Sequence, residues 1–183
     1  MARARIVAWR SNPTSFIEDV FGATPQPWQV EALNSLRDHD RLAIRSGHGV
    51  GKSAFLAWAI LWWLTTRYPA KVACTAPTAH QLYDVLWSEV AAWKRKMPPM
   101  LGEQLEWSSE AIKLLGHGNE SFAVARTSRK EQPEALQGFH SPNMLFLVDE
   151  ASGVDDIVFE VARGALSTVG AKIVLTGNPT RTS

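Results

Sequence analysis

The clearest chemical signal in this sequence is a glycine-rich loop that ends in a lysine and a serine. The loop reads Ser46-Gly47-His48-Gly49-Val50-Gly51-Lys52-Ser53 and lies between a short segment at 41–45 and an apolar run at 54–64. Glycines let backbone N–H groups turn inward around an anion, and a helix that begins near Lys52 points its positive end at the same place. This pattern predicts a loop whose residues 46–51 surround a polyphosphate, with Lys52 on the β- and γ-phosphates and Ser53 on Mg²⁺.

One position departs from the usual phosphate-loop pattern, G-x-x-x-x-G-K-[ST]. Its first glycine is replaced by Ser46. We expect the serine to be tolerated, because Gly47, Gly49 and Gly51 still supply a permissive backbone. The alternative is a glycine-rich turn that binds nothing, but a turn does not need Gly-Lys-Ser in this order.

Two carboxylates follow an apolar segment much later in the chain. Asp149 and Glu150 come directly after residues 143–148, which read as a buried strand. Asp149 can hold Mg²⁺ through water, and Glu150 can orient an attacking water or accept its proton. An isolated Asp-Glu pair after a strand is common, so the prediction of nucleotide hydrolysis depends on the pair occurring together with the phosphate loop.

Two further motifs are suited to recognising the ends of a nucleotide. The helix expected at 27–39 opens with Trp28-Gln29, and a glutamine amide matches the donor and acceptor on the edge of adenine. Asn178 follows the strand expected at 172–176, where its amide can sense a γ-phosphate. The alternatives are an ordinary helix start with a core tryptophan in the first case, and a strand-end turn in the second.

Hydrolysis of this kind usually needs a cation to offset the charge that builds on the γ-phosphate. The candidates in this sequence are Arg45, Arg126, Arg129 and Arg163. The sequence does not choose among them, because a neighbouring subunit can also supply the arginine.

The order of expected elements indicates an α/β fold with a mostly parallel sheet and helices on both faces. In such a fold, ligands bind at the carboxyl ends of the strands, where the phosphate loop, Asp149 and Asn178 all fall. We expect residues 1–22 to form a lead-in and a short helix, and residues 23–183 to form a P-loop ATPase domain. In detail, we expect a loose segment at 1–13, a helix at 14–21 capped by Thr14 or Ser15 and ended near Gly22, helices at 27–39, 54–67, 79–96 and 155–168, and strands at 41–45, 71–76, 105–107, 111–115, 121–125, 143–148 and 172–176.

Composition sets broad limits on the class of protein. The chain has 183 residues, 45% of them hydrophobic, and a net charge of +1, which fits one domain with a sizeable core and neither announces nor excludes nucleic-acid binding. Cys74 is its single cysteine, so no intramolecular disulfide forms. The apolar run at 54–64 is too short to cross a bilayer and the first residues do not read as a signal peptide. We expect a soluble cytoplasmic protein, in the host cytoplasm if it is viral.

Taken together, the motifs resemble the N-terminal ATPase domain of the large terminase subunit of tailed phages, a DNA-packaging motor, over roughly residues 20 to 180. They are Trp28-Gln29, the phosphate loop, the segment at 75–78, Asp149-Glu150 and Thr176-Gly177-Asn178. The resemblance implies a RecA-like P-loop NTPase of the additional-strand type that uses ATP and Mg²⁺ to move double-stranded DNA into a procapsid. It also implies a terminase small subunit, a portal protein and a ring of copies as partners, with a monomer in isolation and no membrane. Arg45 is similar to an arginine that the family often keeps beside the loop.

The resemblance leaves alternatives open. Family members carry a second, nuclease domain, and this sequence ends at Ser183 without one, so we assign no nuclease activity to it. The segment at 75–78 and Gln29 also fit the first motor domain of a superfamily 2 helicase. A nucleotide-dependent assembly module is a third interpretation, and Glu150 argues against it, because a protein that only binds ATP needs no base there.

Overall fold

The computed structural model describes residues 2–127 and 137–178, and it corrects the expected loose lead-in. Helix α1 (Ala2–Ser11) occupies most of that segment. Its residue Trp9 is 6% exposed, and the Trp9 indole N–H donates a hydrogen bond to Asp19 at 2.9 Å. Burial of this one large ring anchors a helix whose other residues are mostly exposed, which is why the polar sequence around it did not read as an element.

The second helix begins slightly earlier than predicted and has a different cap. Helix α2 (Pro13–Phe21) is capped by Asn12, whose side-chain oxygen accepts a hydrogen bond from the backbone N–H of Ser15 at 3.1 Å. The predicted caps, Thr14 and Ser15, lie inside the first turn instead. Gly22 ends the helix with a φ of 63°, as expected for a glycine just past a helix.

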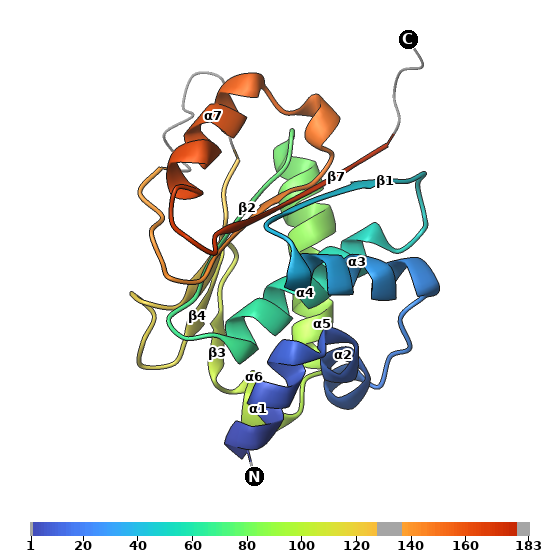
Figure 1. Ribbon diagram of the computed structural model, residues 1–183, viewed down its shortest axis with the longest axis vertical. Helices are drawn as coiled ribbons and strands as arrows, with labels where there is room; N and C mark the ends of the chain where they lie inside the picture. The colour runs from blue at the N-terminus through green and yellow to red at the C-terminus, as the bar shows by residue number, and fades with distance from the viewer. Residues whose placement is uncertain (1, 128–136, 179–183) are drawn as a thin grey trace.

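The seven strands form one sheet in the order β1-β7-β6-β2-β5-β4-β3 (Figure 1). The first five strands in this order are parallel to one another, and β4 and β3 are antiparallel, which confirms the predicted α/β class. Strand β7 lies between β1, which enters the phosphate loop, and β6, which leads to Asp149, as the additional-strand type requires. The strands are β1 (Arg41–Arg45), β2 (Lys71–Thr75), β3 (Leu105–Trp107), β4 (Ala111–Leu114), β5 (Phe122–Ala125), β6 (Met144–Val148) and β7 (Lys172–Gly177).

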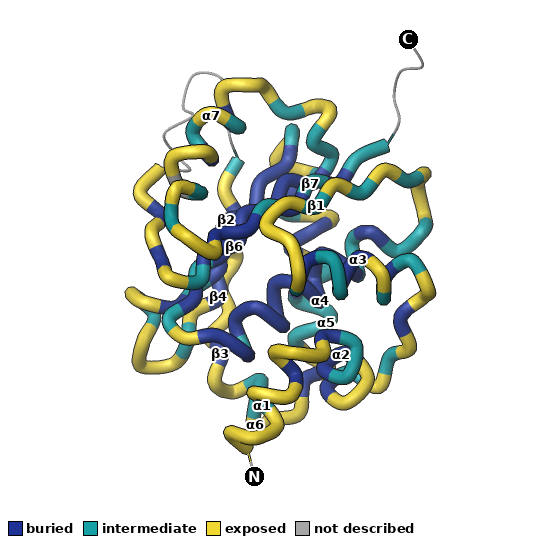
Figure 2. Tube along the Cα trace, in the orientation of Figure 1, coloured by how far each residue is buried: buried dark blue, intermediate teal, exposed yellow. Residues whose placement is uncertain are grey.

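Helices cover both faces of the sheet, as predicted. Alternate residues of the buried central strands face two separate cores: Val72 and Leu147 join one, and Ala73 and Phe146 join the other. The first core is closed by α1 and α2 together with α3 (Pro27–Asp38), α4 (Lys52–Thr66) and α5 (Ser88–Arg95). The second is closed by α7 (Asp156–Ala165) on the opposite face (Figure 1). Figure 2 shows β2 and β6 buried between these layers.

Helix α4 is the central helix of the larger core. Residues 55–64 are all buried, because the helix is apolar on every side and must be covered on every side. The Trp62 indole donates to the carbonyl of Trp9 at 2.8 Å, and the Trp63 indole donates to the carbonyl of Asn143 at 3.0 Å. These contacts fix the helix whose N-terminus carries the phosphate loop. No helix in the described part of the chain has the length and apolar character needed to span a membrane.

The helix predicted at 79–96 is divided. Its first half is a π-helix, η1 (His80–Trp87), and its second half is α5. The Ser88 hydroxyl lies at the junction and donates to the carbonyl of Asp84 at 2.6 Å, a side-chain bond to the backbone that helices at such junctions often carry. The short α6 (Pro99–Gly102) follows, and the predicted hairpin is confirmed as β3 and β4.

Candidate nucleotide-binding site

The phosphate loop joins β1 to α4 at the carboxyl edge of the sheet. Gly49 and Gly51 have φ values of 73° and 90°, which side chains other than glycine rarely adopt. Ser46 is not among the residues with positive φ, so a serine at this position carries no backbone strain. Its backbone N–H donates to the carbonyl of Gly177 at 3.2 Å, and this bond continues the β1–β7 ladder into the loop. The expectation that Ser46 is tolerated is confirmed.

Gln29 lies against the end of the loop. Its side-chain oxygen accepts a hydrogen bond from the backbone of Gln26 at 2.8 Å, and its amide nitrogen donates to the carbonyl of Gly51 at 3.0 Å. A Cβ on residue 51 would lie 2.8 Å from that nitrogen, so only glycine leaves room for the glutamine. Gln29 is 3% exposed and holds the loop in place through its amide. Its contact with adenine stays a prediction.

Trp28, Arg45 and Ser46 share the lining of a hollow of about 340 Å³ between α3 and β1. The Trp28 ring lies 6.0 Å from the ring of Phe55, measured between centroids, and its indole donates to the side chain of Gln26 at 2.9 Å. The tryptophan is therefore packed on one side and borders the hollow on the other. This hollow adjoins the start of the phosphate loop.

Lys52 brings three separate motifs together. Its ammonium group donates to the side-chain oxygen of Asn178 at 2.6 Å and to the carbonyl of Ser46 at 3.3 Å. The same ammonium lies 3.5 Å from a carboxylate oxygen of Glu150. Lys52 is only 8% exposed, so these contacts form with little competition from water. The predicted proximity of Asn178 and Glu150 to the loop is confirmed as geometry.

His48 takes part in the same network, which the sequence did not indicate beyond its place in the loop. The amide nitrogen of Asn178 lies 2.7 Å from the Nε2 atom of His48, while the amide oxygen of Asn178 accepts from Lys52. Asn178 therefore bridges the middle and the end of the phosphate loop. An amide can do this because it presents a donor and an acceptor side by side.

Asp149 is buried and oriented by its neighbours. Its Oδ1 atom accepts a hydrogen bond from the Thr176 hydroxyl at 2.7 Å and another from the backbone N–H of Glu150 at 3.0 Å. Burial raises the pKa of the Asp149 carboxyl above its ordinary value, the Thr176 bond opposes that rise, and the charge of Glu150 adds to it. Thr176 thus positions the carboxylate, a role that its place in the motif did not reveal.

Glu150 has an unusual backbone. Its φ is 50°, the only positive value at a residue other than glycine in the described part of the chain. Such a conformation costs about 1–2 kcal/mol and recurs at functional sites. The turn that it makes after β6 leaves the Glu150 carboxylate in contact with Lys52, so the strained residue is also the predicted base.

The burial of Asp149 leads to a test of stability against pH. A raised pKa in the folded state means that folding is weakened as the pH rises from the unfolded value, near 3.8, through the folded value. Asp149→Asn keeps the acceptor for Thr176 and removes the buried charge. We expect the variant to have a higher unfolding midpoint than the wild type at pH 7 and a smaller difference at pH 4, measured by thermal unfolding. A variant that is destabilised equally at both pH values would contradict this account.

The residues present fit a magnesium ion that arrives with a nucleotide. Among the described residues, no group of three or more His, Cys, Asp or Glu could hold a metal alone. Mg²⁺ in nucleotide sites is held by one or two protein ligands, phosphates and water, so a full protein cage is not needed. Ser53 in the first turn of α4 and the oriented Asp149 supply such a partial set.

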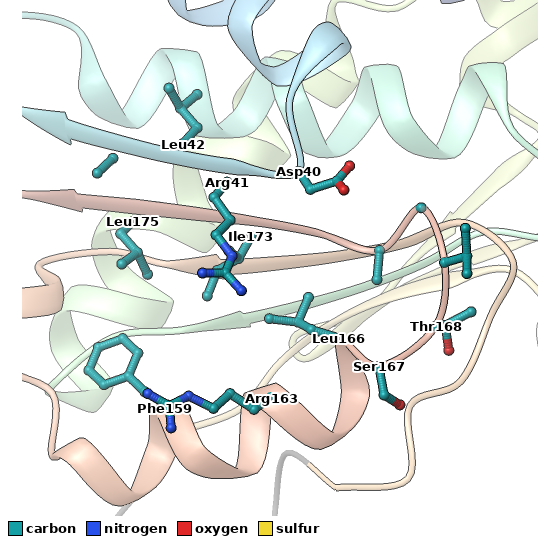
Figure 3. Close-up of a pocket in the computed structure, with 14 residues that line it drawn as sticks. Asp40, Arg41, Leu42, Phe159, Arg163, Leu166, Ser167, Thr168, Ile173 and Leu175 are labelled. Carbon is teal, nitrogen blue, oxygen red and sulfur yellow. The ribbon is translucent and has the colours of Figure 1, made fainter.

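The candidate arginines differ in where the structure places them. Arg45 is exposed at the end of β1, opposite Gly177, and is next to the loop. Arg126 is at the carboxyl end of β5, with β7, β6 and β2 between it and β1. Arg163 lies in a groove between α7 and the β1–β7 edge, near Arg41 and Ile173 (Figure 3). Arg129 lies outside the described residues.

Comparison with known proteins gives a consistent set of relatives. The sequence matches no family model. It is 28% identical, over 186 aligned residues and 99% of its length, to a probable terminase large subunit of Enterobacteria phage P7. It spans 37% of that relative's length.

The fold is that of phage large-terminase ATPase domains. The ATPase domain of the Thermus phage P74-26 large terminase superimposes with a TM-score of 0.69 at 16% identity, over 94% of this chain and 72% of that one. The HK97 bacteriophage large terminase superimposes with a TM-score of 0.67 at 14% identity, over 96% of this chain and 37% of that one. A large terminase of another, thermophilic bacteriophage, solved in complex with ADP, superimposes with a TM-score of 0.61.

Proposed function

We propose that this chain is the ATP-hydrolysing motor domain of a phage large terminase. One observation carries the proposal: the ammonium group of Lys52 is in contact with Asn178 and Glu150, residues that lie far apart in the sequence. A glycine-rich turn without a ligand has no reason to gather these groups. The ADP complex of a structural neighbour and the relative from phage P7 support the same function.

In this proposal the phosphates of ATP enter the loop between Lys52 and the residues that now contact it. Lys52 transfers its hydrogen bonds to the β- and γ-phosphates, and the backbone N–H groups of residues 46–51 surround them. Mg²⁺ would be held by Ser53 and, through water, by Asp149, and it would offset the negative charge of the phosphates. Glu150, released from Lys52, orients the attacking water and takes its proton. Arg45 is the candidate for a cation near the γ-phosphate within this chain.

The base of the nucleotide has a place beside the loop. The hollow of about 340 Å³ lined by Trp28 and Ser46 is within the size range of small-ligand pockets. Gln29 would recognise adenine only if its amide gave up the bond to Gly51 or Gln26. We therefore propose that Gln29 acts on adenine in the bound state and on the loop in the free state.

Asn178 is proposed to report whether ATP is present. It bonds Lys52 and His48 at the same time, so a phosphate that draws Lys52 away leaves Asn178 with one partner fewer. The end of β7 then differs between the free and bound states, which is how a local phosphate contact is transmitted to a moving segment.

The function of the longer protein follows the same comparison. We propose that ATP hydrolysis drives double-stranded DNA into a procapsid, in the host cytoplasm, with a portal protein, a terminase small subunit and further copies of the chain in a ring. The division at residues 22 and 23 stays part of this proposal. Both listed classes of relative favour a terminase over a helicase, and Glu150 disfavours a module that only binds nucleotide.

The proposal is tested by phosphate release from ATP across a dilution series of the purified chain. We expect slow, Mg²⁺-dependent release whose rate per chain rises with concentration, because a neighbouring copy supplies a cation. Fast release that is unchanged by dilution would contradict the shared site, and no release at any concentration would contradict hydrolysis. A labelled duplex in the same reaction distinguishes the alternatives, because a helicase separates its strands and a packaging motor does not.

A further inference from the structure

A second polar pocket lies at the opposite edge of the sheet from the phosphate loop. It is a cavity of about 590 Å³ at the point where α1 and α4 end and where β1, β6 and β7 begin. Arg10, Arg37, Arg67 and Lys172 line it, and Asp40 is the one carboxylate among its lining residues. This concentration of positive charge is unusual in a chain whose net charge is +1.

Arg67 is the buried cation of this pocket. It is 8% exposed, and its guanidinium lies 4.3 Å and 4.0 Å from the ring centroids of Trp62 and Trp63. One of its five N–H groups donates to the Thr66 hydroxyl at 2.9 Å. No ion pair joins Arg67 to a carboxylate in the described part of the chain. A buried charge without a counter-ion is costly, so this guanidinium lacks the partner that such a group normally has.

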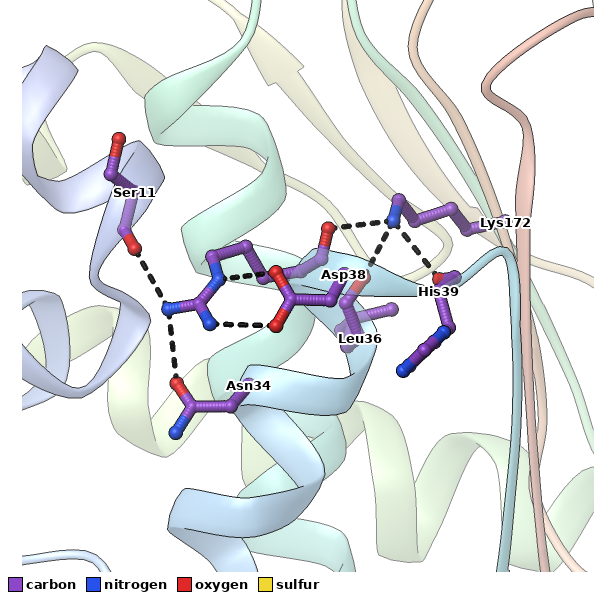
Figure 4. Close-up of polar contacts among 7 residues, drawn as sticks. Ser11, Asn34, Leu36, Asp38, His39 and Lys172 are labelled. Atoms are coloured by element: carbon purple, nitrogen blue, oxygen red, sulfur yellow. Dashed lines mark hydrogen bonds and ion pairs between the residues drawn. The ribbon is translucent and has the colours of Figure 1, made fainter.

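The other buried cations of the cluster are fully engaged by the protein. Lys172 donates to the carbonyls of Leu36, Arg37 and His39 at 2.8–3.0 Å, at the end of α3 (Figure 4). The Arg37 guanidinium forms two bonds of 2.7 Å to Asp38 and one to the carbonyl of Ser11. Helix carbonyls thus account for Lys172, and Asp38 accounts for Arg37. They leave Arg67 unpaired.

The charges around Arg67 repel it. Burial lowers the pKa of Arg67 to about 9, and the positive charge of Arg10 lowers it further in the same direction. Lys172 is also repelled by Arg67. The two tryptophan rings hold the plane of the guanidinium by cation–π contact, so its remaining donors are presented in a fixed orientation.

We propose that this pocket binds a phosphate group, with Arg67 as its principal ligand and Arg10 as a second. A guanidinium held flat between two rings matches the paired oxygens of a phosphate, which would neutralise the cation and accept its free donors. The phosphate belongs either to a nucleic-acid backbone or to a free anion. The inference does not require that the chain hydrolyse ATP; only the nucleic-acid source is connected to the proposed function.

The direct test is an NMR titration of the ¹⁵N-labelled chain with inorganic phosphate at constant ionic strength. We expect saturable shifts of the Arg67 Nε–H and Trp63 indole signals, and no saturable shift at Trp63 in Arg67→Met. Lys113→Gln removes an exposed charge on β4 and is the matched control, which should titrate as the wild type does. The Gly51 amide reports separately on phosphate that enters the nucleotide loop.

A parallel titration with short duplex DNA, at equal phosphate-group concentration, identifies the source. Saturation at lower concentration with DNA assigns the pocket to a nucleic-acid backbone, and saturation at lower concentration with inorganic phosphate assigns it to a free anion. The absence of a saturable Arg67 shift with either probe would overturn the proposal.

Thermal unfolding separates a binding role from a structural one. If Arg67 awaits an anion, phosphate should raise the unfolding midpoint of the wild type by more than that of Arg67→Met, whose side chain still packs between the two tryptophans. A variant that is destabilised by the same amount at every phosphate concentration would show that Arg67 serves only the packing, and the proposal would fall.

Discussion

Replacing Glu150 with glutamine is expected to slow ATP turnover by a factor of about 10²–10⁴ while ATP still binds. Glutamine has the same shape, so it preserves the turn at residue 150, but it cannot accept the proton of the attacking water. The loss of the contact with Lys52, 3.5 Å away, affects only a partly exposed ion pair and should change binding little. Steady-state phosphate release measures turnover, and calorimetry with ATP measures binding.

The control for this prediction is Glu106→Gln. Glu106 is exposed on β3, at the far edge of the sheet from β1, so the same chemical change should leave turnover unaltered. Turnover by Glu150→Gln that equals the wild-type rate would remove Glu150 from the role of base. Loss of ATP binding together with turnover would instead assign Glu150 to the positioning of Lys52.

The sequence predicted the site best where the chemistry depends on residues that follow one another in the chain. The order of loop, Lys52 and Ser53 fixes their relation to the N-terminus of α4, and local pattern is enough to read it. Asp149 and Asn178 were placed correctly because parallel strands bring their carboxyl ends to one edge. The additional strand β7 between β1 and β6 follows from the same rule.

The contacts that were missed depend on packing between distant segments. Nothing in the pattern around Gln29 shows that its amide holds the carbonyl of Gly51, because that bond exists only once α3 is packed on the loop. The role of Thr176 at Asp149 and the link from His48 to Asn178 are of the same kind. The lead-in helix α1 was missed because its burial depends on one residue, Trp9, and not on a repeated apolar pattern.

Removing the Lys52 side chain is expected to have the largest effect on binding. In Lys52→Ala the charge-assisted hydrogen bonds to the phosphates are lost, and at about 1.5–3 kcal/mol each they correspond to a fall in ATP affinity on the order of 10²–10³. The ammonium is buried and bonded to Asn178 at 2.6 Å, so no nearby lysine can replace it. Calorimetric titration with ATP and Mg²⁺ measures the change.

The same substitution separates direct binding from the arrangement of the loop. Lys96→Ala removes a charge from an exposed lysine that lies over Trp93, and it should bind ATP as the wild type does. Asn178→Ala leaves Lys52 in place but removes its strongest partner in the free state, so its ATP affinity should fall far less than that of Lys52→Ala. If Lys52→Ala retains micromolar affinity, the phosphate contact assigned to Lys52 is wrong. If Asn178→Ala loses as much affinity as Lys52→Ala, the amide binds the nucleotide directly, because a residue that only reports the position of Lys52 would not be required for binding.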